Sequence, residues 1–262
     1  LVAEAEDNNL GSNAFDERFR RWDTCSLCEQ RHHGVVACAL GWGCWKTYLS
    51  RPETEQVRGM AMNVLGNGLS NAEHYQDALT VREVDLAMMR RLGADEDDLL
   101  VAQGNLALTY GELGRVDEAL SLRQEVYSGR LRLDGDENEK TLRAASNYAT
   151  SLYSIQRLEE AKSLLRKYMP VARRAYGESN EITLRMRWTY AEVLYKADSA
   201  TLDDIREAVS TLEELAPTAR RVLGSAHPIT KGIGKELRAA LRARETGLAA
   251  SLADMGVADD KG

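Results

Sequence analysis

The amino-acid sequence predicts an all-α fold, a right-handed superhelical solenoid of antiparallel helix pairs, in about four repeats of roughly 42 residues each. Three observations lead to this prediction. Aromatic residues make up 6% of the chain and Pro occurs four times, a composition that favours helices. The segment NLALTYGELGRVDEAL at 105–120 returns in related form as NYATSLYSIQRLEEAK at 147–162. Glycines follow the apolar stretches, as expected for helix ends.

The charge and the hydropathy of the chain argue against some classes of function. The net charge is −7, whereas a protein that binds phosphate backbones needs a basic face. The sequence has no apolar run of about 18 residues or more, and its start lacks the pattern of a signal peptide. We therefore expect a soluble, cytoplasmic protein whose partner is another protein and not a membrane or a nucleic acid.

The first 50 residues precede the repeats. The start of the chain is polar and acidic, so we expect residues 1–24 to form a poorly ordered leader. Residues 25–50 are expected to form a helical cap, and they hold all four cysteines of the chain. Cysteines that are so few and so clustered do not fit a secreted disulfide scaffold.

The cap contains a set of soft metal ligands. Their spacing, Cys-x2-Cys-x4-His-x4-Cys, is that of a zinc knuckle and suits tetrahedral zinc. The predicted zinc ligands are Cys25, Cys28, His33 and Cys38. Four protein ligands would close the coordination shell, so the predicted zinc is structural, and no other cofactor is expected. The alternative is that the cysteines are buried reduced thiols beneath Trp42, Trp45 and Tyr48.

A zinc knuckle also suggests a second function, that of a nucleic-acid-binding protein with the repeats as a docking arm. Knuckles that bind nucleic acid usually place Gly directly before the His, whereas Gly34 follows His33 in this chain. This alternative therefore ranks behind a protein-binding function.

Residues 51–230 are expected to hold the repeats. A small residue recurs in each helix of a pair, because two helices approach closely only where no long side chain intervenes. The expected crossing pairs are Gly66 with Ala78, Ala107 with Ala119, Ala149 with Ala161, and Ala191 with Ala208. The wider spacing of the last pair indicates an insertion at 198–202, which a loop can absorb. Neighbouring pairs bury each other's faces, so the core forms by stacking.

Small and polar residues mark the ends of the helices. Four glycines are expected to be C-terminal caps, namely Gly93, Gly135, Gly177 and Gly224. Three threonines are expected to cap the N-termini of the helices that follow, namely Thr141, Thr183 and Thr230. Residues 231–253 are expected to form a capping helix, and residues 254–262 a disordered tail.

The repeats resemble the tetratricopeptide repeat of the kinesin light chain-like type. The resemblance rests on NLALTYGELGRVDEAL at 105–120 and on VLGSAHPIT at 222–230, and it covers about 58–230. It implies a concave groove, lined by the first helix of each pair, that holds a partner protein. In this family an Asn two residues before the small crossing residue binds the backbone of an extended peptide. Asn105 and Asn147 match that position, whereas Val64 and Thr189 occupy it in the outer repeats.

The surface around these positions combines charged, polar and aromatic side chains. Arginine together with aromatic residues is typical of binding hot spots, and, like the resemblance, it suggests an extended peptide with acidic and aromatic residues. The predicted groove residues are Asn105, Asn147, Arg143, Ser146, Thr150, Tyr153, Arg185, Trp188, Thr189 and Glu192. The alternative is that Trp188 and Tyr190 are packed core and that the arginines form a solvated face.

The repeated unit contains no residue pattern typical of catalysis. The sequence therefore predicts a non-enzymatic scaffold or adaptor that binds a peptide segment of partner proteins in the groove of its repeats.

Overall fold

The computed structural model describes the backbone of residues 12–259 and the side chains of residues 15–246. Within this range every regular element is a helix, and the β-type pairing is limited to one isolated bridge between Thr24 and Arg31. The prediction of an all-α solenoid of helix pairs is confirmed. The chain divides into two compact units, Leu1–Leu122 and Arg123–Gly262, which are described separately.

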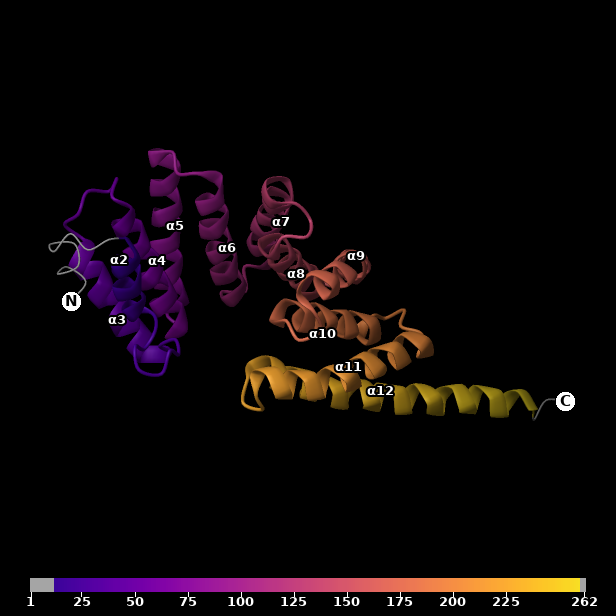
Figure 1. The fold of residues 1–262 in the computed structure, drawn as a ribbon. Coiled ribbons are helices and arrows are strands. Elements are labelled where there is room, and N and C mark those ends of the chain that lie inside the picture. The colour runs from indigo at the N-terminus through magenta and orange to yellow at the C-terminus, as the bar shows by residue number, and fades with distance from the viewer. Residues whose placement is uncertain (1–11, 260–262) are drawn as a thin grey trace. The chain divides into compact units, whose positions relative to one another are not determined.

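Unit 1 begins with short helices and continues with the first helix pairs (Figure 1). Its elements are α2 (Ser12–Phe19), the 3-10 helix η1 (Arg20–Trp22), α3 (Gly34–Tyr48), α4 (Gln56–Asn71), α5 (Tyr75–Leu92) and α6 (Glu96–Glu112). The next helix, α7 (Val116–Asp134), contains the boundary between the units.

Part of the expected leader is helical in the structure. Residues 12–22 form α2 and η1, because their aromatic side chains can pack against the apolar surface of α3. Phe19 is buried against Tyr48 of α3, with ring centroids 5.9 Å apart, and Phe15 and Trp22 pack on the same cluster. Residues 1–11 of the expected leader lie outside the described residues.

The expected cap at 25–50 contains α3, which packs on α4 through two glycines. A Cβ atom on Gly41 would stand 3.0 Å from the Cα of Leu65, and one on Gly68 would stand 2.5 Å from the carbonyl oxygen of Ala37. Both distances are too short for a side chain, so these glycines allow the two backbones to lie in contact.

Unit 2 contains the later helix pairs and a long final helix. Its elements after α7 are α8 (Glu139–Ser154), α9 (Leu158–Tyr176), α10 (Glu181–Lys196), α11 (Leu202–Leu223) and α12 (Pro228–Asp259). The expected capping helix at 231–253 lies within α12, which extends it at both ends and includes 254–259 of the expected tail. Residues 260–262 of that tail lie outside the described range.

The small residues expected at the helix crossings are buried in both units. Gly66 is buried, and the seven alanines have exposed fractions of 0% to 2%. The last pair is separated by the five-residue connection 197–201 between α10 and α11, where the insertion was expected. Thr201 and Asp204 form a capping box at the start of α11, and Asp204 also pairs with Lys162 of α9 at 2.9 Å.

The predicted helix ends are right for the glycines and wrong for the threonines. Each of the four glycines has a positive φ, between 70° and 85°. The N-terminal cap side chains of α8 and α10 are instead Asn138 and Asn180, each of which accepts a backbone N–H of the first turn. Thr141 and Thr230 lie inside their helices, and their hydroxyls donate to carbonyl oxygens of the preceding helix. The first turn of α8 is already capped by Asn138, and that of α12 by His227, whose Nδ1 atom accepts the N–H of Ile229 at 3.3 Å, so the two threonine hydroxyls are available to bridge helices.

Candidate functional site

The exposed part of the predicted groove lies on α8 and α10 of unit 2. Arg143 and Asn147 are exposed on α8, and Arg185 is exposed on α10. Arg143 pairs with Glu139 at 2.6 Å and Arg185 with Glu181 at 2.9 Å, each within its own helix. Surface pairs of this kind contribute only about 0–1 kcal/mol, so either guanidinium can exchange its partner for a carboxylate of a ligand.

The backbone beneath the two predicted asparagines is held by arginines that sequence reasoning missed. Arg82 donates to the carbonyl oxygen of Asn105 at 2.7 Å, and Arg123 donates to that of Asn147 at 3.3 Å. Each arginine also bonds a hydroxyl one turn later, on Thr109 or Ser151. The signal was present in the sequence, since both arginines stand four residues after a crossing alanine.

Three of the predicted groove residues are packing residues of their helices. Ser146 and Thr189 are 2% and 4% exposed, and the hydroxyl of Thr150 donates to the carbonyl oxygen of Ser146 at 3.0 Å. The structure therefore buries Ser146 and Thr189 and leaves Thr150 half-buried.

Trp188 packs on the final helix. A Cβ atom on Gly232 of α12 would stand 2.3 Å from the Cη2 atom of the Trp188 indole. The indole N–H is buried and has no partner among the described residues. Trp188 thus fixes α12 against α10, which agrees with the alternative reading of this residue as packed core.

Tyr153 and Glu192 belong to a polar cluster that joins α8, α10 and α12. Its centre is Lys196, whose ammonium lies 2.9 Å from the Tyr153 hydroxyl, 3.1 Å from Glu192 and 2.9 Å from Glu236. Tyr195 donates a hydrogen bond to the same Glu236. Burial alone would disfavour the Lys196 charge, but the hydrogen bonds with Glu236 and Tyr153 raise the pKa of Lys196. Burial raises the pKa of Glu192.

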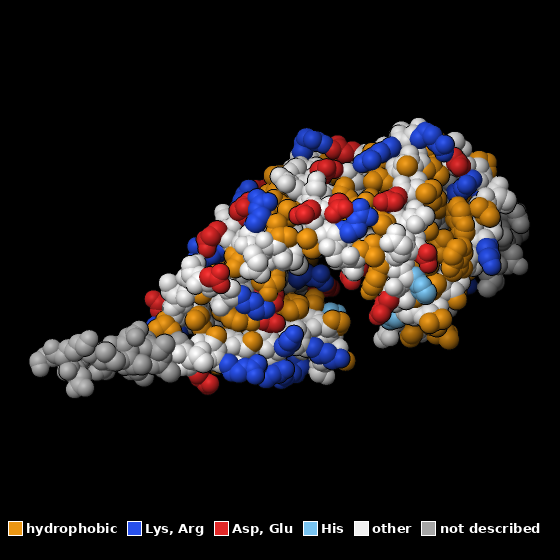
Figure 2. Space-filling model, turned by 180° about the vertical axis from the view of Figure 1, so that it is seen from behind, with side chains coloured by type: hydrophobic (Ala, Val, Ile, Leu, Met, Phe, Trp, Pro, Cys, Tyr) orange, Lys and Arg blue, Asp and Glu red, His pale blue; other side chains and the backbone are white. Residues whose placement is uncertain are grey.

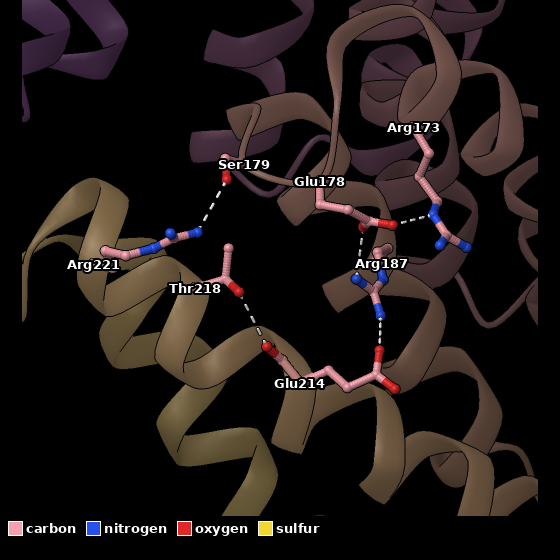
Figure 3. Close-up of polar contacts among 7 residues, drawn as sticks. All are labelled: Arg173, Glu178, Ser179, Arg187, Glu214, Thr218 and Arg221. Atoms are coloured by element: carbon pink, nitrogen blue, oxygen red, sulfur yellow. Dashed lines mark hydrogen bonds and ion pairs between the residues drawn. The ribbon is translucent and has the colours of Figure 1, made fainter.

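A second ionic cluster lies where α9, α10 and α11 meet (Figure 3). The Arg187 guanidinium lies 2.9 Å from Glu178 and 2.5 Å from Glu214, and it is 14% exposed. Glu178 also pairs with Arg173, and Arg221 contacts Ser179 at 3.5 Å. These side chains bind one another between helices, unlike Arg143 and Arg185, whose carboxylate partners lie one turn away on the same helix.

Asn105 belongs to unit 1, where it pairs with an asparagine that the sequence alignment missed. Its side-chain N–H donates to the Oδ1 atom of Asn63 on α4 at 3.2 Å. Sequence reasoning assigned Val64 to this position, because it aligned Gly66 with Ala107. Val64 instead packs against the apolar cluster of Phe19 and Tyr48. Counting back 42 residues from Asn105 gives Asn63, the residue to which it is bonded.

Basic side chains also gather on the C-terminal helix. Lys231, Lys235, Arg238 and Arg242 recur on α12 at helical spacing and are exposed. Figure 2 shows Lys and Arg side chains along the lower edge of the molecule, over the C-terminal helices. The acidic net charge is therefore not spread evenly over the surface.

The predicted zinc ligands do not form one group in the structure. Cys25 and Cys28 lie in the turn closed by the Thr24–Arg31 bridge, and His33 immediately precedes α3. Cys38 packs against the core cluster of Leu65, Leu69 and Ala78. Among the described residues, no three His, Cys, Asp or Glu side chains come together as a metal site. Zinc stays a prediction, which metal analysis of the purified protein can test.

The two ends of the cap should differ in thiol reactivity. Backbone N–H groups of Cys28 and Leu27 lower the pKa of Cys25, whereas burial raises the pKa of Cys44 to about 12. Because the thiolate is the nucleophile, we expect iodoacetamide at pH 7.5 to alkylate Cys25 well before Cys44. Peptide mass spectrometry after timed quenching measures both rates, and equal rates would contradict this reading of the cap.

Stacked antiparallel helix pairs define an α-solenoid, a class of protein with an extended surface for binding. The family model described as "Tetratricopeptide repeat" matches residues 98–174. The predicted resemblance to the tetratricopeptide repeat is thus confirmed. No curated protein matches the sequence. Within the described residues, the helices are too short or too polar to cross a membrane.

Solved structures show the same fold at low sequence identity. TPR-like repeats of a kinesin light chain-like protein from Podosopora anserina have a TM-score of 0.59 at 21% identity, covering 77% of this chain and 92% of that one. BtubC (BKLC) from P. vanneervenii has a TM-score of 0.56 at 14% identity, covering 80% and 90%. A Rap protein in complex with Competence and Sporulation Factor has a TM-score of 0.52 at 12% identity, covering 81% and 60%.

Proposed function

We propose that the chain is a non-enzymatic adaptor that binds an extended segment of a partner protein on the surface formed by α8 and α10. The observation that carries this proposal is the exposure of Arg143 and Asn147 on α8 and of Arg185 on α10. The two arginines are 42 residues apart, so successive repeats present the same charge at the same position. The side chains of an extended segment also recur at a fixed spacing, so such a segment can contact both arginines.

Each exposed group has a distinct role in this proposal. The side-chain amide of Asn147 offers a donor and an acceptor to the backbone of the bound segment. Arg143 and Arg185 form bidentate contacts with its carboxylates, which replace the contacts to Glu139 and Glu181. The bound segment is therefore acidic. A preference for aromatic residues rests on the family resemblance, since Trp188 is engaged with Gly232.

The fold likeness to the Rap protein complex supports a ligand-binding use of this architecture, although that likeness concerns the fold alone. The polar clusters of unit 2 also favour a scaffold over an enzyme. The ionisable groups around Lys196 satisfy one another, and Arg187 is held between two glutamates. Such closed clusters stabilise helix packing and leave no reactive group free for a substrate.

A double variant tests the proposal. Replacing Asn147 and Arg185 with Ala should abolish the capture of most partner proteins, because it removes one backbone contact and one charge from the binding surface. Helical content by circular dichroism should stay the same, since both side chains are exposed. Affinity capture with mass spectrometry provides the measurement.

The matched control replaces Arg206 and Gln124 with Ala. Arg206 is exposed and pairs with Asp203 within one turn, as Arg185 pairs with Glu181. The control should capture the same partners as the wild type. Identical partner sets for the double variant and the wild type would count against the proposed surface.

A further inference from the structure

Unit 1 contains a cavity of about 340 Å³ bounded by residues from α4, α5, α6 and the segment before α4. Its apolar lining includes three methionines, Met60, Met88 and Met89, together with Leu92 and Val101. Its charged lining consists of Glu53, Glu55, Asp85 and Asp98, and the lining contains no Lys, Arg or His. The cavity is therefore apolar on its walls and exclusively acidic in charge.

Asp85 is the unusual member of this lining. It is 9% exposed, and its Oδ1 atom is buried without a hydrogen-bond partner among the described residues. Burial raises the pKa of Asp85 to about 6. A buried carboxylate that lacks a partner is unfavourable, and a cationic group bound in the cavity beside it would offset that cost.

The other acidic residues of the cavity are placed differently. Glu53 pairs with Arg91 and, at 3.6 Å, with Arg58. Glu55 lies 3.8 Å from Arg51. Asp98 is exposed in the first turn of α6. Asp85 is thus the buried carboxylate of the cavity, and Asp98 adds negative charge nearer to solvent.

We propose that this cavity binds a Lys or Arg side chain of an extended protein segment, with the cationic group at Asp85 and the aliphatic stem between the methionines. The proposal rests on the proposed function, which it extends to unit 1 by naming a side chain that the partner must carry. Long basic side chains combine an apolar stem with a charged end, and methionines adapt to the shape of such a stem.

Charge and ligand chemistry decide against other occupants. An anionic ligand would meet four carboxylates, and the arginines that pair with Glu53 and Glu55 do not line the cavity. A metal ion is not favoured either, because the described residues hold no group of three side chains suited to one. Asn63 and Asn105 line the same cavity, and their mutual hydrogen bond leaves the Oδ1 atom of Asn105 and the N–H groups of Asn63 for a peptide backbone. A peptide therefore matches both features, because its side chain can enter the acidic cavity while its backbone bonds the two asparagines.

The test uses peptides of the form acetyl-Ala-X-Ala-amide, in which X is Lys, Arg, norleucine or Glu. Binding is followed by NMR of the protein labelled with ¹³C-methyl methionine. The methyl groups of Met60, Met88 and Met89 report on the cavity. Met62 and Met186 are buried outside it and serve as internal controls.

The Lys and Arg peptides should shift the three cavity signals and leave the two controls unchanged. Norleucine, which has the apolar stem without the charge, should bind about tenfold more weakly, as expected for the loss of one charge-assisted hydrogen bond. The Asp85→Asn variant should bind the Lys and norleucine peptides equally. Equal binding of these two peptides to the wild type, undiminished preference for Lys in the variant, or unshifted cavity signals would each overturn the proposal. None of these readouts involves Asn147 or Arg185, so this proposal and the proposed function can fail separately.

Discussion

Replacing Gly68 with Ala is expected to lower the free energy of unfolding of unit 1 by about 2 kcal/mol. The new Cβ atom would stand 2.5 Å from the carbonyl oxygen of Ala37 and 3.1 Å from the Cα of Cys38. Because these are backbone atoms of α3, the clash is relieved only if α3 and α4 separate. Overpacking of this kind costs about 1–3 kcal/mol or more, which exceeds the gain of about 1 kcal/mol from replacing Gly with Ala in a helix.

Urea unfolding followed by tryptophan fluorescence measures this change, since Trp22, Trp42 and Trp45 all lie in unit 1. Gly59→Ala in the same helix is the matched control, because nothing lies within 4 Å of its added Cβ. The control should be as stable as the wild type or more stable. A Gly68→Ala variant as stable as the control would show that α3 does not lie against α4 as described.

Replacing Asp85 with Asn is expected to stabilise the protein at pH 8, by about 1–3 kcal/mol. Burial raises the pKa of Asp85 from 3.8 to about 6 in the folded state. Between these values the folded protein holds a proton that the unfolded chain has released, so stability falls as the pH rises from 4 to 6. Above pH 6 the full penalty of the buried charge is present, whereas below pH 4 it vanishes. The other charged groups of the cavity are carboxylates, which do not oppose this effect.

The measurement is the denaturation midpoint of wild type and Asp85→Asn at pH 4 and pH 8. The two proteins should differ at pH 8 and converge at pH 4. Asp77→Asn, at an exposed position in the first turn of the same helix, is the matched control and should not stabilise the protein at pH 8. A variant that is less stable than the wild type at pH 8 would indicate that Asp85 has a partner within the protein.

The repeat itself could be predicted from the sequence because its evidence is local and periodic. Small residues such as Ala107 and Ala149 recur with the chain's own period, and only a close helix crossing explains why they are buried completely. The glycine caps follow from a similar local rule, since a left-handed residue at a helix end favours Gly. The five-residue connection before α11 was visible as a break in the same period.

The side-chain partners across repeats could not be predicted in the same way. Lys196 meets Glu236 across 40 residues of sequence, and no local rule links them. Thr141 was placed wrongly because a threonine near a helix start fits both a cap and a buried bridge, and packing decides between them. Nothing in the sequence around Asp85 marks it as unusual, because its environment is formed by residues of α4 and α6 that line the same cavity.

Photo-crosslinking from the α8 surface tests the central claim most directly. Benzoylphenylalanine placed at Asn147 should crosslink to partner proteins through acidic segments, identified by mass spectrometry of the crosslinked peptides. The same group placed at Gln124 or Arg206 should give no such products. Crosslinks of equal yield and identity from all three positions, or none from position 147 while partners remain bound, would contradict the account.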